Sequence, residues 1–397
     1  MASITIKNVG PIKNVEIELN KVNVFMGPQS SGKSTIAKII SYCKWVEKRY
    51  MLDGFFRDDY YERLKTYHNF EDTYFINDDA QITYEGDYYT IEFLKEKLEV
   101  QFFTKDHTQS EKFDNRKQIF IPAERNFVAS IQNLGRYKET NNNIMDFLYY
   151  WYEAKKHYTK SNILNIPTLG ISFYHIQNED KDMVVLDEGK EIILQNASSG
   201  FQSMIPLYLL MDYLTNILYK KEIILSPFEI EQIRERAKAV SGSNKEVTNS
   251  TIELHRKRLN YNYSQFIIEE PEQNLFPSTQ RDLVYHLLQL ITGERDHQLT
   301  ITTHSPYILY ALNNCMLGHL VNSQLKNEEK NEYLANEFLS KQSWIDPKSV
   351  SIWEIEDGEL RSIQDKDNII AENYFDLKMT ELTDEYCQIL NYYKNEE

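Results

Sequence analysis

Short runs in which apolar and polar residues alternate open the chain. The segments ITIKNV, VEIEL and VNVFM predict three strands. Alternation marks the second as half-buried, and a near-continuous apolar run marks the third as fully buried. After a loop that contains glycine, SGKSTIAKIISYCKWVEKRY carries apolar residues at helical spacing. The pattern predicts a strand that runs through a tight loop into a helix.

The same alternation of elements continues toward the C-terminal part of the chain. QIFIP, ISFYHI, DMVVLD, SQFIIEE and HQLTITTHS predict further strands. Helical patterns lie in NIMDFLYYWYEAKKHY, in the apolar stretch that follows NASSGFQ, and in STQRDLVYHLLQLI. Strands that alternate with helices in this way predict an α/β fold.

Changes in composition divide the chain into a head and three other segments. Residues 49–118 hold 16 acidic and 10 basic side chains with eight tyrosines, whereas residues 226–262 hold seven basic and five acidic ones. We expect a head made of residues 1–48, 119–225 and 263–360, an acidic Tyr-rich inserted lobe at 49–118, a helical and locally basic insertion at 226–262, and an acidic tail at 361–397.

The bulk composition narrows the class of protein. Of the 397 residues, 41% are hydrophobic and 26% charged, which is typical of a globular chain. No apolar run approaches 18 residues, and the opening MASITIKNVG has no secretion pattern, so we expect a cytoplasmic protein without a membrane partner. The three cysteines form no CxxC pair, which argues against a zinc or disulfide scaffold. A net charge of −16 opposes a broad nucleic-acid-binding surface but still permits a local basic groove.

The loop GPQSSGKST matches the pattern G-x-x-x-x-G-K-[ST]. Small residues let backbone N–H groups surround phosphate oxygens, and the following helix N-terminus adds a favourable dipole. Lys33 is expected to reach the β- and γ-phosphates of a nucleotide, and the Ser34 hydroxyl to bind Mg²⁺. A strand–turn–helix without a ligand is the alternative. The nucleotide-binding residues that we predict are Gly27, Pro28, Gln29, Ser30, Ser31, Gly32, Lys33, Ser34 and Thr35.

Two later strands end in candidate catalytic groups. In FIIEEPEQNLFP, a buried strand ends at Glu269 and Glu270, and a carboxylate there is costly unless it meets a cation. We predict that Glu269 completes the Mg²⁺ shell and that Glu270 activates the attacking water. In TITTHSP, His304 ends the next strand, from which it can contact the γ-phosphate or the water. The alternatives are exposed strand-end glutamates and a satisfied core histidine.

Two further segments are candidates for contacts with a second molecule. In NASSGFQ, Ser199 and Gly200 begin a helix and so present a hydroxyl, a backbone N–H and a helix N-terminus to an anion; an ordinary N-cap is the alternative. Five of the basic side chains of residues 226–262 are candidates for nucleic-acid or partner contact, with a solvated helix face as the alternative. These are Arg234, Arg236, Arg256, Lys257 and Arg258.

In this order, the four motifs resemble the ABC-type ATPase heads, namely the SMC-like and RecF-like group and the OLD-like ATPases. GPQSSGKST resembles Walker A, FIIEEPEQNLFP resembles Walker B with its D-loop, TTHSP resembles the switch histidine, and NASSGFQ resembles a degenerate signature. The E-P-E-x-x-L-x-P form is typical of the OLD-like branch, although Glu269 stands where most related motifs have Asp. The resemblance spans residues 1–48, 119–210 and 263–360.

The resemblance implies a P-loop NTPase of ABC-ATPase type that uses ATP and Mg²⁺. Such heads pack head to tail as dimers or higher oligomers, with ATP between the Walker A of one subunit and the signature of the other. It therefore implies that Ser199, Gly200 and Gln202 act on the partner's nucleotide. The segment IPAER resembles a strand-end motif of the OLD-like branch, which implies that Arg125 lies near the nucleotide.

The C-terminal part carries neither a TOPRIM-like nor an HNH-like pattern, so we expect any nuclease to be a separate polypeptide. We therefore expect an ATPase that senses a signal and controls a separate effector, similar to the ATPase subunits of Septu- or PARIS-type anti-phage systems. The alternatives are a RecF-like or SMC-like DNA repair ATPase that binds DNA across its dimer, a slowly hydrolysing scaffold, and the ATPase subunit of a transporter.

Overall fold

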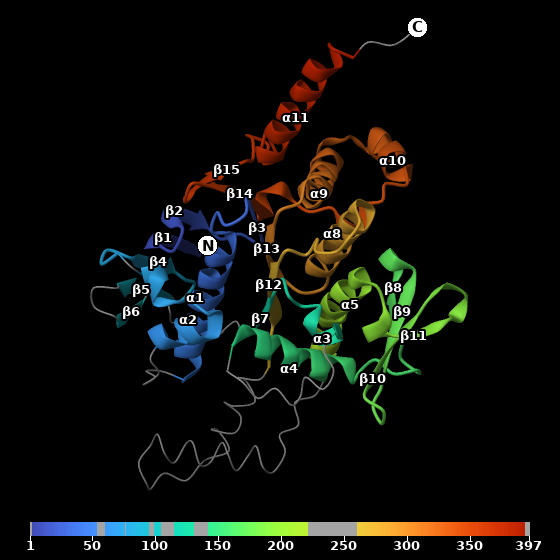
Figure 1. The fold of residues 1–397 in the computed structure, drawn as a ribbon, viewed down its shortest axis with the longest axis horizontal. Coiled ribbons are helices and arrows are strands. Elements are labelled where there is room, and N and C mark those ends of the chain that lie inside the picture. Colours follow the sequence, from blue (N-terminus) through green and yellow to red (C-terminus); the bar gives the residue numbers. More distant parts are fainter. Residues whose placement is uncertain are drawn as a thin grey trace.

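The computed structural model describes residues 2–53, 60–75, 77–94, 99–104, 115–130, 142–220 and 260–393. At its centre is a six-stranded sheet in the order β15-β14-β3-β13-β12-β7 (Figure 1). Its strands are β3 (Val22–Met26), β7 (Arg116–Ile121), β12 (Tyr263–Glu269), β13 (Gln298–Thr303), β14 (Val350–Glu356) and β15 (Glu359–Ser362). All neighbours pair in parallel except β14 and β15.

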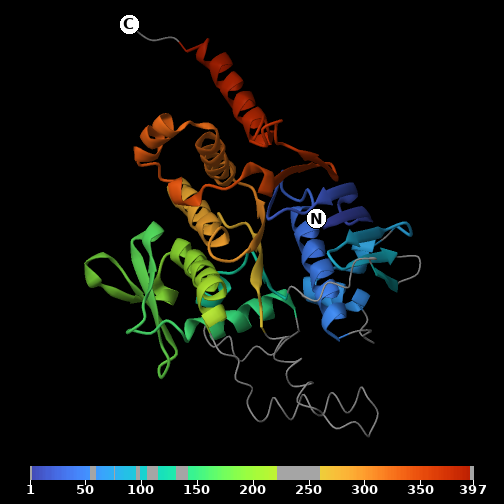
Figure 2. The same cartoon turned by 180° about the vertical axis from the view of Figure 1, so that it is seen from behind.

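Helices cover both faces of this sheet, which confirms the predicted α/β architecture. Helix α1 (Lys33–Asp53) lies on one face, and α5 (Ser199–Asp212), α8 (Pro277–Ile291) and α9 (Pro306–Gln324) lie on the other (Figures 1 and 2). Alternate residues of each strand enter the two cores. Ile267 packs on the α1 side and Ile268 on the opposite side. Burial on both faces explains the continuous apolar runs of β3 and β12.

A second, antiparallel sheet has the order β2-β1-β4-β5-β6. Its strands are β1 (Ser3–Val9), β2 (Ile12–Glu18), β4 (Gln81–Glu85), β5 (Tyr89–Leu94) and β6 (Glu99–Thr104), and α2 (Tyr60–His68) lies beside it. Strand β4 pairs directly with β1, with Ile82 opposite Ile6. Three strands of the acidic interval 49–118, β4, β5 and β6, therefore extend the N-terminal sheet of the head, whereas its first residues belong to α1 and its last to β7. Composition could not reveal this pairing, because the two strands are far apart in sequence.

A third sheet, in the order β11-β10-β9-β8, stands beside α5. It consists of β8 (Leu164–Ile166), β9 (Ile171–Ile176), β10 (Lys181–Val185) and β11 (Glu191–Ile193). Helices α3 (Phe127–Ser130) and α4 (Asn143–Lys155) connect it to β7 along the chain. The short helical segments are η1 (Asp72–Phe75), η4 (Pro167–Leu169), η5 (Asp187–Gly189), η6 (Leu194–Asn196), η7 (Tyr213–Ile217), η8 (Leu218–Lys220), η9 (Lys341–Ser343) and η10 (Pro347–Ser349).

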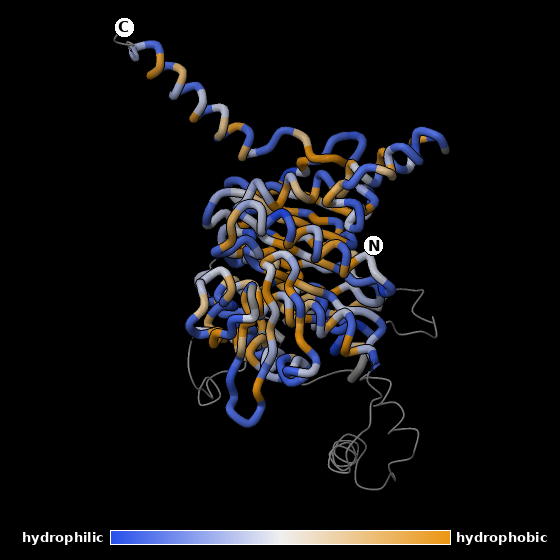
Figure 3. Tube along the Cα trace, turned by 90° about the vertical axis from the view of Figure 1, so that its right-hand side faces the viewer, coloured by the Kyte–Doolittle hydropathy of each residue, from blue (hydrophilic) through white to orange (hydrophobic). Residues whose placement is uncertain are grey.

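Two helices complete the described fold, namely α10 (Asn327–Ala335) and α11 (Tyr374–Leu390). The second lies within the predicted acidic tail and projects away from the body of the molecule (Figures 1 and 3). None of the helices in the described ranges combines the length and the apolar character that crossing a bilayer requires.

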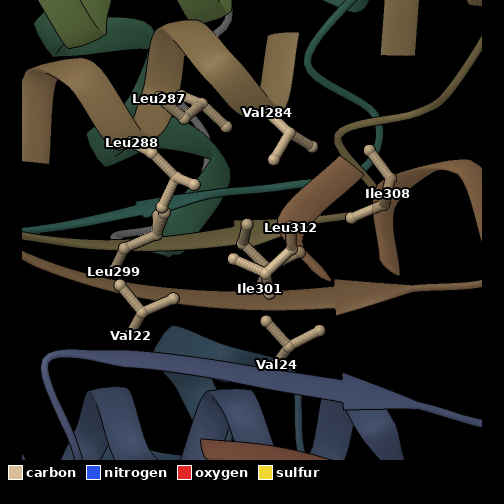
Figure 4. A pocket seen from close by; sticks show the side chains of 9 residues that line it. All are labelled: Val22, Val24, Val284, Leu287, Leu288, Leu299, Ile301, Ile308 and Leu312. Carbon is tan, nitrogen blue, oxygen red and sulfur yellow. The ribbon is translucent and has the colours of Figure 1, made fainter. Parts of the chain in front are cut away.

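A small gap in the core lies between β3 and β13 on one side and α8 and α9 on the other (Figure 4). Its lining is entirely aliphatic and consists of Val22, Val24, Val284, Leu287, Leu288, Leu299, Ile301, Ile308 and Leu312. A lining without polar atoms offers nothing to a phosphate or a metal ion. We therefore treat this gap as a packing feature of the core, and the candidate site lies elsewhere.

Candidate functional site

The site forms where parallel strands end side by side. Strands β3, β13 and β12 are consecutive neighbours in the central sheet, and all three end at the same edge. Thr303 at the end of β13 pairs with Met26 at the end of β3, and Glu269 at the end of β12 pairs with Thr302. This register brings the glycine-containing loop, Glu270 and His304 to one edge, as the sequence predicted.

The loop after β3 has a backbone that ordinary residues rarely adopt. Gly27, Ser30 and Gly32 have φ values of 147°, 63° and 107°. A Cβ on Gly27 would lie 2.3 Å from the carbonyl oxygen of Ile355, and one on Gly32 would lie 2.4 Å from Cδ1 of Ile12. Glycine is therefore required at both positions. The loop leads directly into the N-terminus of α1, where backbone N–H groups favour an anion.

Lys33 is folded back into its own loop. Its Nζ donates hydrogen bonds to the carbonyl oxygens of Gly27 (2.9 Å) and Pro28 (2.6 Å). The side chain is only 4% exposed, and this burial lowers the pKa of Lys33 to about 8, although the nearby Glu270 and Glu272 carboxylates oppose the shift. The amino group therefore rests inside the loop and is held by acceptors that a phosphate oxygen can replace.

Ser34 and Glu269 lie together at the start of α1 and the end of β12. Burial raises the pKa of Glu269, although the nearby Ser34 hydroxyl favours its ionised form and opposes the shift. Its Oε1 atom is buried without a hydrogen-bond partner. An unpartnered buried oxygen is costly, and a hard cation between the hydroxyl and the carboxylate would satisfy it. The described residues contain no cluster of three or more His, Cys, Asp or Glu able to hold a metal ion.

Glu270 and His304 form a pair on neighbouring strand ends. His304 Nε2 lies 3.3 Å from Glu270 Oε1, and Gln273 Nε2 donates to Glu270 Oε2 at 3.0 Å. The hydrogen bond to His304 is the main reason that the pKa of Glu270 is lowered. Both side chains are about one-third exposed, so water can reach them. Glu270 has a φ of 42°, and its N–H donates to the carbonyl oxygen of Thr302.

Glu272 is a site residue that the sequence analysis did not single out. Its Oε1 accepts hydrogen bonds from the Thr303 hydroxyl (2.9 Å) and from the backbone N–H of His304 (2.6 Å), so its carboxylate ties the segment after β12 to the end of β13. Burial raises the pKa of Glu272, and its Oε2 is buried without a partner. Glu272 is the second glutamate of the E-P-E motif, and this motif was the feature of the sequence from which its role could have been predicted.

Arg125 lies behind the strand ends and is completely buried. Its Nε donates to the carbonyl oxygen of Ser203 at 3.1 Å, and its two terminal nitrogens donate to those of Glu269, Glu270 and Pro271 at 3.0 Å each. Burial lowers the pKa of Arg125 to about 10. The structure therefore directs the guanidinium of Arg125 at backbone carbonyls of α5, of the end of β12 and of the two residues after it, and a contact of Arg125 with a nucleotide stays a prediction.

Arg125 also links α5 to the segment after β12. Its Nε donates to the carbonyl oxygen of Ser203, which lies in the first turns of α5. The same guanidinium contacts the backbone on both sides of Glu270, and so it joins the start of α5 to the end of β12.

The three signature residues have different surroundings. Ser199 begins α5 and is exposed, with Ser198 as the N-cap that accepts the N–H of Phe201. Gly200 is pressed against the segment after β12, because a Cβ there would lie 3.0 Å from the carbonyl oxygen of Asn274. The Gln202 carboxamide is occupied inside its own loop, since Nε2 donates to the carbonyls of Leu194, Gln195 and Ala197. Ser199 is thus the residue among the three that faces solvent.

The basic side chains predicted to contact nucleic acid or a partner, Arg234, Arg236, Arg256, Lys257 and Arg258, lie outside the described residues.

Comparison with known proteins places the site in context. A family model described as "AAA domain, putative AbiEii toxin, Type IV TA system" matches residues 22–309, a range that holds the loop, Glu270 and His304. No curated protein matches the chain.

Solved structures are similar over nearly the whole length, but only loosely. The SMC head domain from Thermotoga maritima is 11% identical, with 94% of this chain and 98% of that chain covered and a TM-score of 0.39. An Smc head domain from Pyrococcus furiosus, with an extended coiled coil and bound to the C-terminal domain of ScpA, is 11% identical, with 97% and 99% covered and a TM-score of 0.39. A nucleotide-free ATP-binding cassette from an ABC transporter is 10% identical, with 93% of each chain covered and a TM-score of 0.33. Scores of this size denote a loose superposition and assign no function to this chain.

Proposed function

The chain belongs to the AAA-domain family whose description names a putative AbiEii toxin, and we propose that it is a Mg²⁺-dependent ATPase. In this proposal it works as an oligomeric regulator of a separate effector protein in bacterial anti-phage defence. One observation carries the ATPase assignment. At a single sheet edge, a glycine loop with a retracted lysine meets an unpartnered buried carboxylate oxygen and a paired glutamate and histidine. Each group has a defined task in phosphoryl transfer to water.

Binding begins at the loop. Backbone N–H groups of the loop and of the first turn of α1 hold the phosphates. Lys33 leaves the carbonyls of Gly27 and Pro28 and contacts the β- and γ-phosphates. Ser34 and Glu269 would hold Mg²⁺, which would neutralise charge that develops on the phosphate oxygens.

Hydrolysis requires a base beside the γ-phosphate. Glu270 accepts a proton from water as the water oxygen bonds to the γ-phosphorus, and the bond from that phosphorus to the ADP oxygen breaks. His304 holds the Glu270 carboxylate in place and offers its ring to the γ-phosphate. Glu272 holds the His304 backbone, so that the pair keeps its separation.

A second copy completes the site in this proposal. Ser199 and the N-terminus of α5 are exposed and carry a hydroxyl, N–H donors and a positive dipole end. These groups suit the γ-phosphate of an ATP bound to another subunit, which gives the head-to-tail arrangement. The contact exists only while the γ-phosphate is present, so association follows the nucleotide state.

The effector is proposed to be a nuclease or toxin on another polypeptide. The family description names a toxin of a Type IV TA system, which supports a regulatory or toxic role over DNA repair. Nucleic-acid binding by residues 226–262 stays a prediction from the sequence, because their basic side chains lie outside the described residues.

Mass measured by light scattering tests the proposal. With ATP and Mg²⁺, we expect the mass of Glu270→Gln to rise above its value without nucleotide, because bound ATP is not consumed. Lys33→Ala is expected neither to bind ATP nor to gain mass. Ser199→Arg in the Glu270→Gln background is the matched control, since it should bind ATP as Glu270→Gln does and yet fail to gain mass. ATP binding by Lys33→Ala, or an unchanged mass of Glu270→Gln, would contradict the mechanism.

Burial of Lys33 predicts that ATP binding takes up a proton at alkaline pH. The pKa of Lys33 is about 8 in the free chain, and bound phosphates raise it, because they favour the charged amine. Below pH 7 the amine is already protonated, so binding takes up almost no proton. Near pH 9 the free amine is mostly neutral, so we expect uptake of about 0.9 proton and roughly tenfold weaker binding.

Calorimetry in two buffers of different ionisation enthalpy measures this uptake directly. Lys33→Arg is the control, because a guanidinium stays charged throughout this range and should remove the proton uptake. Equal uptake at pH 7 and pH 9 in the wild type would show that Lys33 does not hold the phosphates.

A further inference from the structure

Gln273 lies three residues after Glu270, and its side chain turns back toward that residue. Its Nε2 donates a hydrogen bond to Glu270 Oε2 at 3.0 Å, and its backbone N–H donates to the carbonyl oxygen of Glu270 at 3.2 Å. The two residues are therefore joined at two points, one on the backbone and one at the carboxylate. Gln273 has no task in the mechanism proposed above.

The Glu270 carboxylate is held by one donor on each of its oxygens. His304 Nε2 lies 3.3 Å from Oε1, and Gln273 supplies the donor to Oε2. The last torsion of a glutamate side chain has only a weak preference of its own, so one donor would leave the plane of the carboxylate free to turn. Two donors on opposite oxygens fix that plane. Each oxygen keeps a second lone pair that can face a water molecule.

The backbone of Glu270 is fixed independently of the Gln273 side chain. Glu270 has a φ of 42°, which a residue other than glycine rarely adopts. Its N–H donates to the carbonyl oxygen of Thr302 at 2.9 Å, and its own carbonyl oxygen accepts from Arg125 at 3.0 Å and from the Gln273 N–H. A substitution at position 273 keeps these three bonds, because the backbone N–H remains. It removes only the donor to the carboxylate.

We propose that Gln273 is a positioning residue that holds the Glu270 carboxylate in the orientation in which it accepts a proton from the attacking water. The inference rests on the proposed ATPase mechanism, in which Glu270 is the base. Gln273 acts through Glu270 and needs no contact with the nucleotide. Orientation matters because a displacement of about 1 Å can cost roughly a hundredfold in rate. The neutral amide also donates without forming an ion pair, which would occupy the base.

Gln273→Met tests the proposal, because methionine has nearly the same length as glutamine and carries no donor. We expect kcat for ATP hydrolysis to fall about 10–100-fold and KM to stay within about twofold, since the lost contact matters to the base and not to ATP binding. Gln273→Glu should lower kcat further, because a second carboxylate would replace the donor and repel Glu270. A kcat equal to that of the wild type in either variant overturns the proposal.

Gln280→Met is the matched control, because Gln280 supports the same segment without contacting Glu270. Its Nε2 donates to the carbonyl oxygen of Leu275 at 2.9 Å, and its Oε1 accepts from the Ser305 hydroxyl. We expect this variant to lose stability in denaturant unfolding and to keep kcat within about threefold of the wild type. An equal fall of kcat in the Gln280 and Gln273 variants would make both residues structural supports and overturn the proposal.

A double-mutant cycle with Glu270→Gln tests whether Gln273 acts through the base. In the Glu270→Gln background, Gln273→Met should lower the residual turnover by no more than about twofold, because no base is left to orient. Losses that multiply in the double variant overturn the proposal. Hydrolysis by Glu270→Gln at the wild-type rate is a different outcome, since it would contradict the proposed function itself.

A crystal structure of nucleotide-free Gln273→Met tests the geometry without any measurement of activity. We expect the Glu270 carboxylate to leave the position that it has in the wild type, while the backbone of residues 269–273 stays in place. A carboxylate that keeps its position beside His304 in this variant would show that Gln273 does not orient it. This outcome overturns the positioning role whether or not the chain hydrolyses ATP.

Discussion

Glu270→Gln is expected to lower the ATP turnover number by about two to four orders of magnitude and to leave ATP affinity nearly unchanged. The substitution keeps the size of the side chain, and its oxygen can still meet His304. A carboxamide, however, cannot accept the proton of the attacking water. The wild-type carboxylate is ready for this task, because the hydrogen bond to His304 lowers the pKa of Glu270 and keeps it ionised.

Steady-state and single-turnover hydrolysis, together with the binding of a fluorescent ATP analogue, separate the two effects. Glu272→Gln is the matched control. This variant neutralises a carboxylate two residues away, but its amide oxygen can still accept from Thr303 and from the N–H of His304. We expect its turnover to stay within about tenfold of the wild type. Hydrolysis by Glu270→Gln at the wild-type rate would move the base to another residue.

Arg125→Met is expected to lower the free energy of unfolding by about 3–5 kcal/mol, the range for breaking a buried charged network. The guanidinium is completely buried and donates to the carbonyl oxygens of Ser203, Glu269, Glu270 and Pro271, which would lose this donor. Lysine cannot restore the cluster, because one ammonium group lacks the fork geometry that reaches acceptors on both sides.

Denaturant unfolding measures the stability change. Arg281→Met is the control, because Arg281 pairs with Asp282 near the surface and its loss should cost no more than about 1 kcal/mol. Kinetics at low temperature, where the variant stays folded, then assign the role. A fall in kcat with unchanged ATP affinity supports Arg125 as a positioning residue. A rise in KM with unchanged kcat would favour the nucleotide contact that the motif IPAER suggested.

Local patterns predicted those parts of the molecule in which one segment determines its own structure. The three opening strands, the loop before α1 and the strand ends at Glu269 and His304 lie where the sequence placed them. Apolar periodicity sets burial, and parallel strands bring their ends together, so these residues were predictable as one group. The family match is consistent with that part of the analysis.

Contacts between segments that are far apart in the sequence could not be predicted from it. The carboxylate of Glu272 and the guanidinium of Arg125 both form hydrogen bonds with backbone groups of other elements. Every residue has a backbone, so the pattern of residue types does not indicate which backbone group a side chain contacts. The pairing of β4 with β1 likewise depends on a partner far along the chain. The exposed apolar side chains of α11 recur at helical spacing in the sequence, but the acidic composition of residues 361–397 drew attention to charge and not to this spacing.

The order of the central sheet also governs when this protein becomes functional during synthesis. Strand β3, which carries the glycine loop, is hydrogen-bonded on one side to β13 (Gln298–Thr303) and on the other to β14 (Val350–Glu356). The ribosome makes both partners long after it has made β3, so the loop gains support on both sides only after residue Glu356 has emerged. A chain cut short before β13 would have neither neighbour beside its loop. If the chain controls a harmful effector, as proposed above, this topology would keep fragments that lack β13 and β14 from acting on it.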